Sequence, residues 1–332
     1  MKVRRYSPVS RGRLRALRVS MVYCTLCVCI AGCPSKASQE ANQPPAKSPP
    51  PPTTSNQQPT TSSGQPTTIT HYRYKVVKTY PHDPQAFTQG LAYEDGILYE
   101  GTGLYDRSVL TKRDLESGKV LKRERLDGQY FGEGIAVFRD RVIQLTWQSQ
   151  TGFVYDKTTF RLLKEFKYGG EGWGLTHDGK QLIMSDGTAN LRFLDPNTLT
   201  ETRRVTVRDN GRNVTLLNEL EYVADGPHVA QPPPAVKPKG SPPRAGVPHA
   251  EKGAGLIFAN ILYSDFIVII DPGTGRVTGR LDLTYLWPLS NRPSPEFVLN
   301  GIAWLPKSNH LLITGKCWPK LYEIQLMAQT SE

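Results

Sequence analysis

The chain has 332 residues, 38% of them hydrophobic, and a formal net charge of +11 at pH 7. This length fits one large all-β domain or two smaller domains. The positive charge does not indicate nucleic-acid binding, because residues 1–32 hold seven basic residues and no acidic one. Without them the formal charge falls from +11 to +4, and nucleic-acid binding would need a basic stripe on the folded part.

The first 32 residues predict a lipoprotein signal peptide. Basic residues extend to Arg18, and the apolar run that follows, residues 19–30, is too short to span a bilayer in a mature protein. The run leads into Ile30-Ala31-Gly32-Cys33, which resembles a bacterial lipobox. We therefore expect lipidation at Cys33 and an exported lipoprotein anchored to a bacterial membrane on its periplasmic or cell-surface side. The alternative is a coincidental match around one cysteine.

Cysteine and histidine spacing gives no sign of a disulfide or a metal site. Three cysteines lie within the signal and Cys33 would be acylated, which leaves Cys317 alone. The six histidines show no ligand spacing, so we expect neither metal nor cofactor. Residues 33–70 are rich in Pro, Ser, Thr and Gln, a composition that cannot bury enough apolar surface to fold and predicts a disordered tether.

One short signature recurs five times after the tether. The copies are Thr88-Gln89-Gly90-Leu91-Ala92, Phe131-Gly132-Glu133-Gly134-Ile135-Ala136, Gly172-Trp173-Gly174-Leu175-Thr176, Leu217-Asn218-Glu219-Leu220-Glu221 and Leu299-Asn300-Gly301-Ile302-Ala303. A period of roughly 40 to 45 residues with several short strands per repeat is typical of a β-propeller. We predict that residues 71–328 form an all-β, five-bladed β-propeller with four-stranded antiparallel blades.

Both ends of this region are irregular. A strand expected over 73–80 precedes the first signature, and the last repeat is short. The amino-terminal strand would complete the last blade and close the ring, unless it is a loose leading strand. Residues 226–254 form a Pro-rich insertion, which we interpret as an inert excursion from a hairpin, with partner binding as the alternative.

The repeat register predicts a ring of side chains at one mouth of the central channel. Residues at the same offset in each repeat share a level, and here they are Gln89, Glu133, Trp173, Asn218 and Asn300. The second strand of each blade returns to the same mouth, which places Trp147 and Lys316 above the ring. The tight turns and the Pro-rich insertion are expected at the opposite face.

This ring offers acid–base chemistry. A carboxyl such as that of Glu133 in an aromatic pocket can have its pKa raised and shuttle a proton. Carboxamides and Lys316 can hold a polar substrate and stabilise an oxyanion. The alternatives are a structural salt bridge between Glu133 and Lys316 and tryptophans that only fill the core.

Several longer stretches resemble the plant and bacterial type of glutaminyl-peptide cyclotransferase, the glutamine cyclotransferase family. They are residues 81–91, 144–147, 170–179, 184–187, 217–222 and 314–320, together with Phe131-Gly132-Glu133-Gly134, and they keep their order from about residue 72 to 326. The resemblance implies a metal-independent, five-bladed aminoacyltransferase that converts amino-terminal Gln of peptides or proteins to pyroglutamate and releases ammonia.

The same resemblance implies roles for individual residues. Glu133 would be the general acid and base, with Asn218 and Lys316 completing the catalytic set. Substrate would contact five further side chains: Phe87, Gln89, Phe131, Trp147 and Trp173. We expect a monomer that meets membranes only through its lipid anchor.

Two departures from the family pattern affect the expected site. Ala259-Asn260-Ile261-Leu262 stands where an Ala-Asn-Val-Trp sequence is common, so one aromatic wall is lost unless Tyr263 replaces it. Cys317 stands where an apolar residue is usual. A propeller that only binds peptide or glycan would need no acid. A lactonase-like metal propeller would need paired acids that this chain lacks.

Overall fold

The computed structural model describes residues 69–224, 226 and 255–328. The predicted signal peptide, almost all of the tether and nearly the whole Pro-rich insertion lie outside these residues. Within them, every element is a β-strand except one short 3-10 helix, η1 (Leu289–Asn291). No helix in the described ranges has the length and apolar character needed to cross a membrane.

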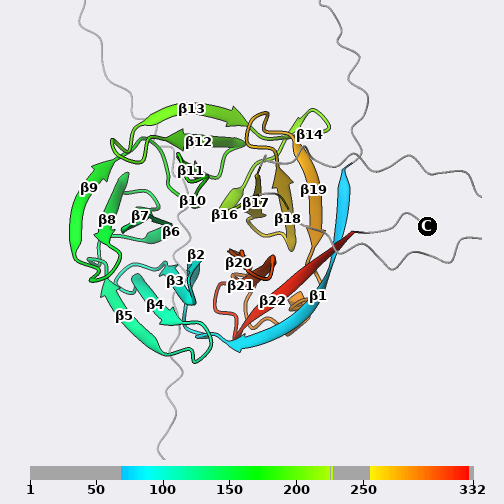
Figure 1. The fold of residues 1–332 in the computed structure, drawn as a ribbon, viewed down its shortest axis with the longest axis horizontal. Helices are drawn as coiled ribbons and strands as arrows, with labels where there is room; N and C mark the ends of the chain where they lie inside the picture. The colour runs from blue at the N-terminus through cyan, green and yellow to red at the C-terminus, as the bar shows by residue number, and fades with distance from the viewer. Residues whose placement is uncertain (1–68, 225, 227–254, 329–332) are drawn as a thin grey trace, which may run out of the picture. The chain divides into compact units, whose positions relative to one another are not determined.

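Three four-stranded antiparallel sheets follow one another along the chain (Figure 1). Their strands are β2 (Thr88–Glu94), β3 (Ile97–Thr102), β4 (Val109–Asp114) and β5 (Val120–Arg125); β6 (Gly132–Phe138), β7 (Arg141–Thr146), β8 (Thr151–Asp156) and β9 (Leu162–Lys167); and β10 (Leu175–His177), β11 (Leu182–Ser185), β12 (Asn190–Leu194) and β13 (Glu201–Thr206).

The other long strands form one eight-stranded sheet in the order β16-β17-β18-β19-β1-β22-β21-β20. These strands are β1 (Thr70–Pro81), β16 (Leu217–Val223), β17 (Leu256–Ile261), β18 (Phe266–Ile270), β19 (Val277–Asp282), β20 (Leu299–Leu305), β21 (His310–Gly315) and β22 (Lys320–Ala328). A small two-stranded sheet pairs β14 (Arg208–Asp209) with β15 (Arg212–Asn213).

The amino-terminal strand β1 pairs with the carboxy-terminal strand β22. The pairing is antiparallel, with Tyr80 opposite Leu321, and it confirms the predicted partnership of the two ends of this region. The strand begins at Thr70, three residues before the predicted start. It also pairs in parallel with β19 over three residues, Thr70 to Tyr72, which joins two groups of four strands into one sheet. The described residues therefore form three four-stranded sheets and one eight-stranded sheet, besides the small two-stranded one, whereas the sequence predicts five separate four-stranded blades.

Inner strands of successive sheets contact one another in a closed cycle, β2 to β6, β10, β16, β20 and back to β2 (Figure 1). The signature glycine makes this close approach possible. The Gly134 N–H donates to the Trp173 carbonyl oxygen over 2.7 Å, and a Cβ at Gly134 would lie 2.5 Å from that oxygen. A side chain here would push β6 away from its neighbour, which explains glycine in the repeat.

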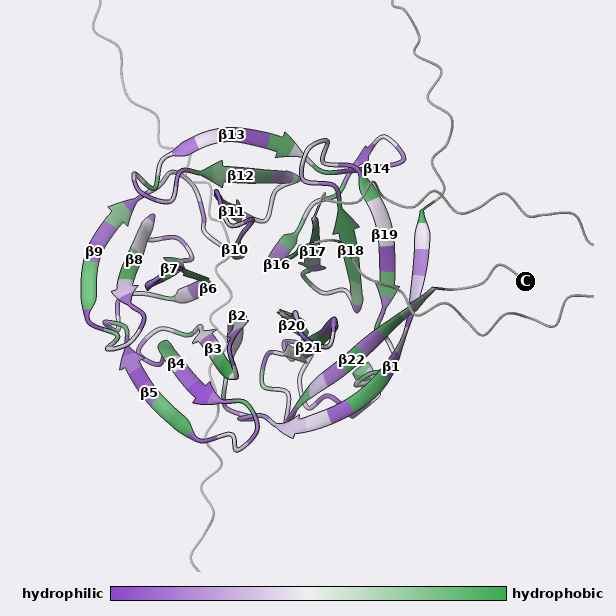
Figure 2. Cartoon of the chain, in the orientation of Figure 1, coloured by the Kyte–Doolittle hydropathy of each residue, from purple (hydrophilic) through white to green (hydrophobic). Residues whose placement is uncertain are grey.

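The hydrophobic core lies between neighbouring sheets. One cluster joins Leu91 and Leu98 to Ala303, Leu312 and Leu321 across two sheets. The central strand β18 is buried after its first residue and is hydrophobic along its length (Figure 2), whereas the outermost strands β9 and β13 are mostly exposed. The core therefore lies between the sheets, and the outermost strands face solvent.

Candidate functional site

The residues of the predicted ring lie where the inner strands begin. Four of them, Gln89, Glu133, Asn218 and Asn300, are the second residues of β2, β6, β16 and β20. Trp173 lies two residues before β10. The structure thus brings the five repeat positions to the same end of the inner strands, as their spacing predicts.

A chain of hydrogen bonds crosses the ring from Asn300 to Glu133. Asn300 Nδ2 donates to Gln89 Oε1 over 3.2 Å and to the Thr88 carbonyl oxygen over 2.9 Å. Gln89 Nε2 then donates to Glu133 Oε1 over 3.1 Å. Since Gln89 accepts from one neighbour and donates to the other, its orientation is fixed. The Glu133 carboxyl is therefore held in one place.

Glu133 is a buried carboxyl, with 5% of its surface exposed. Burial raises its pKa well above the ordinary value, the Lys316 ammonium opposes the rise, and the Glu171 carboxylate adds to it. A carboxyl with a raised pKa can both accept and donate a proton near neutral pH. Glu133 has the properties of a general acid and base.

Lys316 follows β21 and faces the same site. It is buried, and desolvation lowers its pKa while the charge of Glu133 acts in the opposite direction. Its Nζ lies 4.9 Å from the centre of the Phe87 ring, at a cation–π distance. In the part of the chain that is described, no ion pair within 4.0 Å joins Lys316 to Glu133. The alternative of a closed structural salt bridge is not what the structure shows.

Aromatic rings stand edge to face along one side of the site. Phe131 is the centre of this row, with its ring centroid 6.3 Å from that of Phe87, 5.6 Å from Trp147 and 5.5 Å from Tyr105. The structure brings the predicted aromatic residues together and adds Tyr105, which the sequence analysis did not single out. Tyr105 lies in the loop between β3 and β4, where the repeat signature gives no signal.

Glu171 holds both tryptophans of the site. Its Oε2 accepts hydrogen bonds from Trp147 Nε1 and Trp173 Nε1, each over 2.8 Å, while its Oε1 accepts from Gln148 over 3.0 Å. Burial acts to raise the pKa of Glu171, but these hydrogen bonds outweigh it and the pKa lies below its ordinary value. The tryptophans are therefore held by a carboxylate at their polar edges.

Glu171 is a second acid at this mouth, and the sequence analysis did not single it out. Glu171 comes from the loop between β9 and β10, outside the inner-strand positions that the repeat register compares. The stretch Gly170-Glu171-Gly172-Trp173 contains it, so two tryptophans expected at one mouth are the signal that could have prompted a search for their shared acceptor.

Asn218 contributes free hydrogen-bonding capacity to the ring. It is 2% exposed, and its Oδ1 has no hydrogen-bond partner among the described residues. An unpaired buried acceptor is costly, so a substrate donor at this position would be favoured. Next to it, the Glu219 carboxylate accepts backbone N–H groups of Leu91 and Ile302 over 3.2 and 2.9 Å, and so ties three inner strands together.

The two departures from the family pattern occupy different environments. Leu262 is partly buried, and its N–H donates to the Leu216 carbonyl oxygen over 2.9 Å. Tyr263 has a left-handed backbone (φ 63°) and is 65% exposed, so its ring lies largely in solvent. Cys317 also has a left-handed backbone (φ 58°), and its N–H donates to the Ala86 carbonyl oxygen over 2.8 Å beside Lys316.

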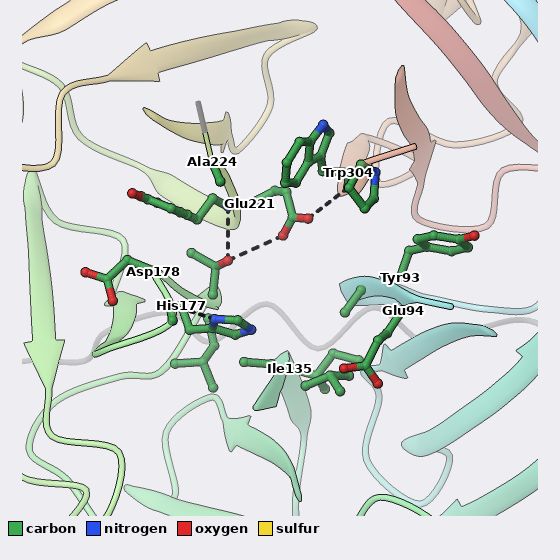
Figure 3. A pocket seen from close by; sticks show the side chains of 16 residues that line it. Tyr93, Glu94, Ile135, His177, Asp178, Glu221, Ala224 and Trp304 are labelled. Carbon is green, nitrogen blue, oxygen red and sulfur yellow. Dashed lines mark hydrogen bonds between the residues drawn. The ribbon is translucent and has the colours of Figure 1, made fainter. Parts of the chain in front are cut away.

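A cavity of about 340 Å³ lies at the other end of the inner strands (Figure 3). Trp304 and Glu221 line it, together with His177 and Asp178 of a tight turn. Glu221 accepts from the Trp304 N–H over 2.8 Å and from Thr176 Oγ1 over 3.3 Å. The strand β16 that leads toward the Pro-rich insertion also ends here. Among the described residues that line this cavity there is no lysine, so it lacks the buried ammonium that accompanies the carboxyl of Glu133.

The arrangement around Glu133 can perform proton transfer on a small polar group. It combines a buried carboxyl, a buried ammonium, carboxamides and an aromatic wall, all within one mouth. In the ranges that the structure describes, no group of three or more His, Cys, Asp or Glu side chains is placed to hold a metal ion.

Comparisons with known proteins point to one family. The family model for glutamine cyclotransferase matches residues 52–229 and 244–326. A glutaminyl-peptide cyclotransferase of Arabidopsis thaliana is 40% identical over 256 residues, which cover 76% of this chain and 71% of the relative. The crystal structure of Myxococcus xanthus glutaminyl cyclase matches with a TM-score of 0.64 and 32% identity, covering 79% of this chain and all of that one. The chain belongs to the glutamine cyclotransferase family.

Proposed function

We propose that this protein cyclises the amino-terminal glutamine of peptides or proteins to pyroglutamate and releases ammonia. The observation that carries the proposal is the buried Glu133 carboxyl, which accepts from Gln89 and faces the Lys316 ammonium at the mouth lined by Phe131 and Trp147. The relatives named glutaminyl-peptide cyclotransferase and glutaminyl cyclase support the same reaction.

In this reaction the neutral α-amine of the substrate attacks its own γ-carbonyl carbon. The new C–N bond closes a five-membered lactam, the bond to the side-chain nitrogen breaks, and ammonia leaves. Glu133 takes a proton from the attacking amine and delivers it to the departing nitrogen, so the carboxylate is regenerated after each turnover. Its raised pKa suits both steps.

Lys316 and Asn218 stabilise and position the reacting group. The Lys316 ammonium, buried beside Glu133, offers positive charge to the oxygen of the γ-carbonyl as that oxygen becomes negative. The unpaired Oδ1 of Asn218 accepts a hydrogen bond from an N–H of the substrate. Gln89 accepts from Asn300 and donates to Glu133, so it orients the Glu133 carboxyl, and its second N–H and second oxygen lone pair can contact the substrate.

The aromatic residues wall the glutamine side chain and exclude water from it. Phe87, Phe131 and Trp147 supply flat apolar surface next to the charged groups, and Trp173 is fixed beside them through Glu171. Exclusion of water strengthens the electrostatic effect of Lys316 and favours the folded substrate conformation that brings amine and carbonyl together.

The enzyme class that follows is an aminoacyltransferase that needs no metal or other cofactor. Purified protein should release ammonia and form pyroglutamate from several Gln-initiated dipeptides in the presence of a chelator. Absence of pyroglutamate on all of them would remove the enzyme function and leave a propeller that only binds peptide or glycan. Activity that disappears with the chelator and returns with a divalent cation would overturn metal independence.

We also propose that the fold is a five-bladed propeller in which the eight-stranded sheet supplies two blades. Two observations support this division. The inner strands form a cycle of five, and a core cluster that includes Phe258 and Ile267 of one half and Leu299 and Ile313 of the other fills the space between the halves. The three-residue parallel pairing of β1 with β19 then links two blades that are otherwise packed face to face.

Anchoring is proposed from the sequence. Residues 1–32 would be removed, Cys33 lipidated, and the propeller at 71–328 held as a monomer at a bacterial membrane by a tether over 33–70. The Pro-rich insertion at 226–254 would take no part in catalysis. A Cys33→Ser variant should move from the membrane fraction to the soluble fraction while keeping its activity, and a variant that stays in the membrane fraction would contradict the anchor.

A further inference from the structure

A second cavity, of about 320 Å³, opens over one face of the β2–β5 sheet. Four arginines contribute to its lining: Arg107, Arg113, Arg123 and Arg125. Arg107 comes from the loop before β4, Arg113 from β4, and the other two from β5. This concentration of guanidinium groups around one hollow distinguishes it from the acidic and aromatic cavity at the other end of the inner strands.

The sequence places these side chains together through strand alternation. Alternate residues of a strand face the same side of a sheet, so Arg113 shares a face of β4 with Thr111, and Arg123 shares a face of β5 with Arg125. The residues between them point to the other face. Lys122 of β5, which does not line the cavity, is an example.

Acidic groups do not neutralise this cavity. Glu100 lies at its base, but this carboxylate is fully buried and already bonded to His82, Thr88 and Arg113 over 2.8, 2.8 and 2.9 Å. The other acid in the lining is Asp83. Arg107, Arg123 and Arg125 form no ion pair within 4.0 Å among the described residues, and they leave the cavity with excess positive charge.

Two polar atoms of the lining residues also lack partners. Thr111 Oγ1 and Arg113 Nε are buried, and neither forms a hydrogen bond with any described residue. Thr111 is 1% exposed, so its unpaired hydroxyl carries a desolvation cost. Arg125 donates to the Asp106 carbonyl oxygen over 2.9 Å and Arg113 to Glu100, so the guanidinium groups that remain to bind an oxyanion are chiefly those of Arg107 and Arg123.

This cavity borders the site around Glu133. Gly103 belongs to its lining, and a Cβ at that position would lie 2.2 Å from the Phe131 ring and 3.0 Å from Gln89 Cγ. Ala86 belongs to it as well, directly before Phe87, and accepts the backbone hydrogen bond of Cys317 next to Lys316. A peptide whose first residue occupies the site can therefore extend toward the arginines.

We propose that this cavity binds the carboxylate of an acidic residue that follows the amino-terminal glutamine of the substrate. Arg107 and Arg123 reach the carboxylate as paired donors, since guanidinium groups bind carboxylates in a fork geometry. The enzyme would then prefer peptides with Asp or Glu shortly after the glutamine. This inference rests on the proposed cyclase function and specifies its substrate class.

The test compares matched peptides on the full-length protein. Gln-Glu-Ala-Ala, Gln-Ala-Glu-Ala and Gln-Ala-Ala-Glu, each with an amidated carboxy terminus, are set against the same peptides with Gln in place of Glu. For at least one pair, kcat/KM should be about five- to tenfold higher for the acidic peptide at low salt. Equal values for all three pairs would overturn the proposal.

Two sets of substitutions test whether the preference for acidic peptides depends on the arginines of the cavity. Arg107→Gln combined with Arg123→Gln should reduce the ratio of acidic to neutral kcat/KM to about one. Lys122→Gln removes one positive charge from the same strand without touching the cavity, and should keep the ratio. A ratio that survives the double variant, or that falls equally in Lys122→Gln, would contradict the assignment.

Inorganic phosphate distinguishes a substrate carboxylate from a free anion. If phosphate inhibits cyclisation of the acidic peptide but not of the neutral one, the proposal is supported. If phosphate inhibits both reactions equally, the cavity is a free-anion site and the proposal is overturned.

If no peptide is cyclised, the proposed function fails and the cavity is tested by calorimetry with pyroglutamyl-Ala-Glu-Ala and pyroglutamyl-Ala-Gln-Ala. Tighter binding of the acidic product to wild type but not to the double variant supports the cavity, and equal binding rejects it.

Discussion

Gln89 donates a hydrogen bond from Nε2 to Oε1 of Glu133 over 3.1 Å, and its own oxygen accepts a hydrogen bond from Asn300. The bond fixes the carboxyl that moves the proton. Gln89→Met keeps the length of the side chain and removes the donor. Loss of a hydrogen bond to a charged group costs about 1.5–3 kcal/mol, so we expect kcat/KM to fall about 10- to 100-fold.

Steady-state pyroglutamate formation measures this change. Asn300 keeps its bond to the Thr88 carbonyl in the variant, so the thermal midpoint should change little. An unchanged kcat/KM would show that Glu133 does not depend on Gln89 for its orientation.

Glu171 orients Trp147 and Trp173 through one carboxylate oxygen. Glu171→Leu removes the acceptor for both indoles and should raise KM, about tenfold if the wall loses one well-placed contact. Glu171→Gln keeps an acceptor oxygen and should restore KM. Equal KM values in wild type and Glu171→Leu would mean that the indoles are held without the carboxylate.

The pH–rate profiles of the same two variants test the effect of the Glu171 charge on Glu133. Glu171 raises the pKa of Glu133, so either substitution should lower the pKa of Glu133 and move the corresponding limb of the pH–rate profile to lower pH. A limb that moves in Glu171→Leu but not in Glu171→Gln would assign the effect to packing.

Glu221, in the cavity at the other end of the inner strands, has its pKa raised to about 8 by burial. A raised pKa means that the folded protein binds a proton more tightly than the unfolded chain. The stabilisation is present below the unfolded pKa of 4.5 and is lost as pH rises toward 8. Glu221→Gln should therefore lose less stability than wild type between pH 5 and 9.

Unfolding in urea at pH 5, 7 and 9 checks this expectation. Glu219 also has its pKa raised by burial, and the charge of Glu221 raises it further, so the Glu219 contribution shrinks in Glu221→Gln and adds to the expected difference. Parallel stability curves for wild type and Glu221→Gln would show that the carboxyl of Glu221 does not titrate as described.

Repeat spacing was enough to bring Gln89, Glu133, Asn218 and Asn300 to one mouth, because inner strands with the same signature begin at the same level. The antiparallel return of β7 and β21 likewise predicted the positions of Trp147 and Lys316. These predictions succeed because they depend only on strand direction and register.

Glu171 and Tyr105 could not be found in this way. Both come from loops, whose paths follow local turns and side-chain contacts instead of a repeated strand register. The eight-stranded sheet could not be predicted either. It forms because β1 pairs with β19 through three residue pairs between segments far apart in the sequence, and no local sequence pattern indicates such a pairing. The arginine cavity lay beyond reach too, since strand alternation becomes informative only once the pairing of β4 and β5 is known.

The most direct test of the account is the turnover of Glu133→Gln on Gln-initiated dipeptides, measured as ammonia and pyroglutamate beside wild type. The amide still accepts the hydrogen bond from Gln89 but cannot take up a proton, so kcat should fall about 10²- to 10⁴-fold. Circular dichroism should show an unchanged fold. Wild-type turnover by the folded Glu133→Gln protein would contradict the assignment of proton transfer to Glu133.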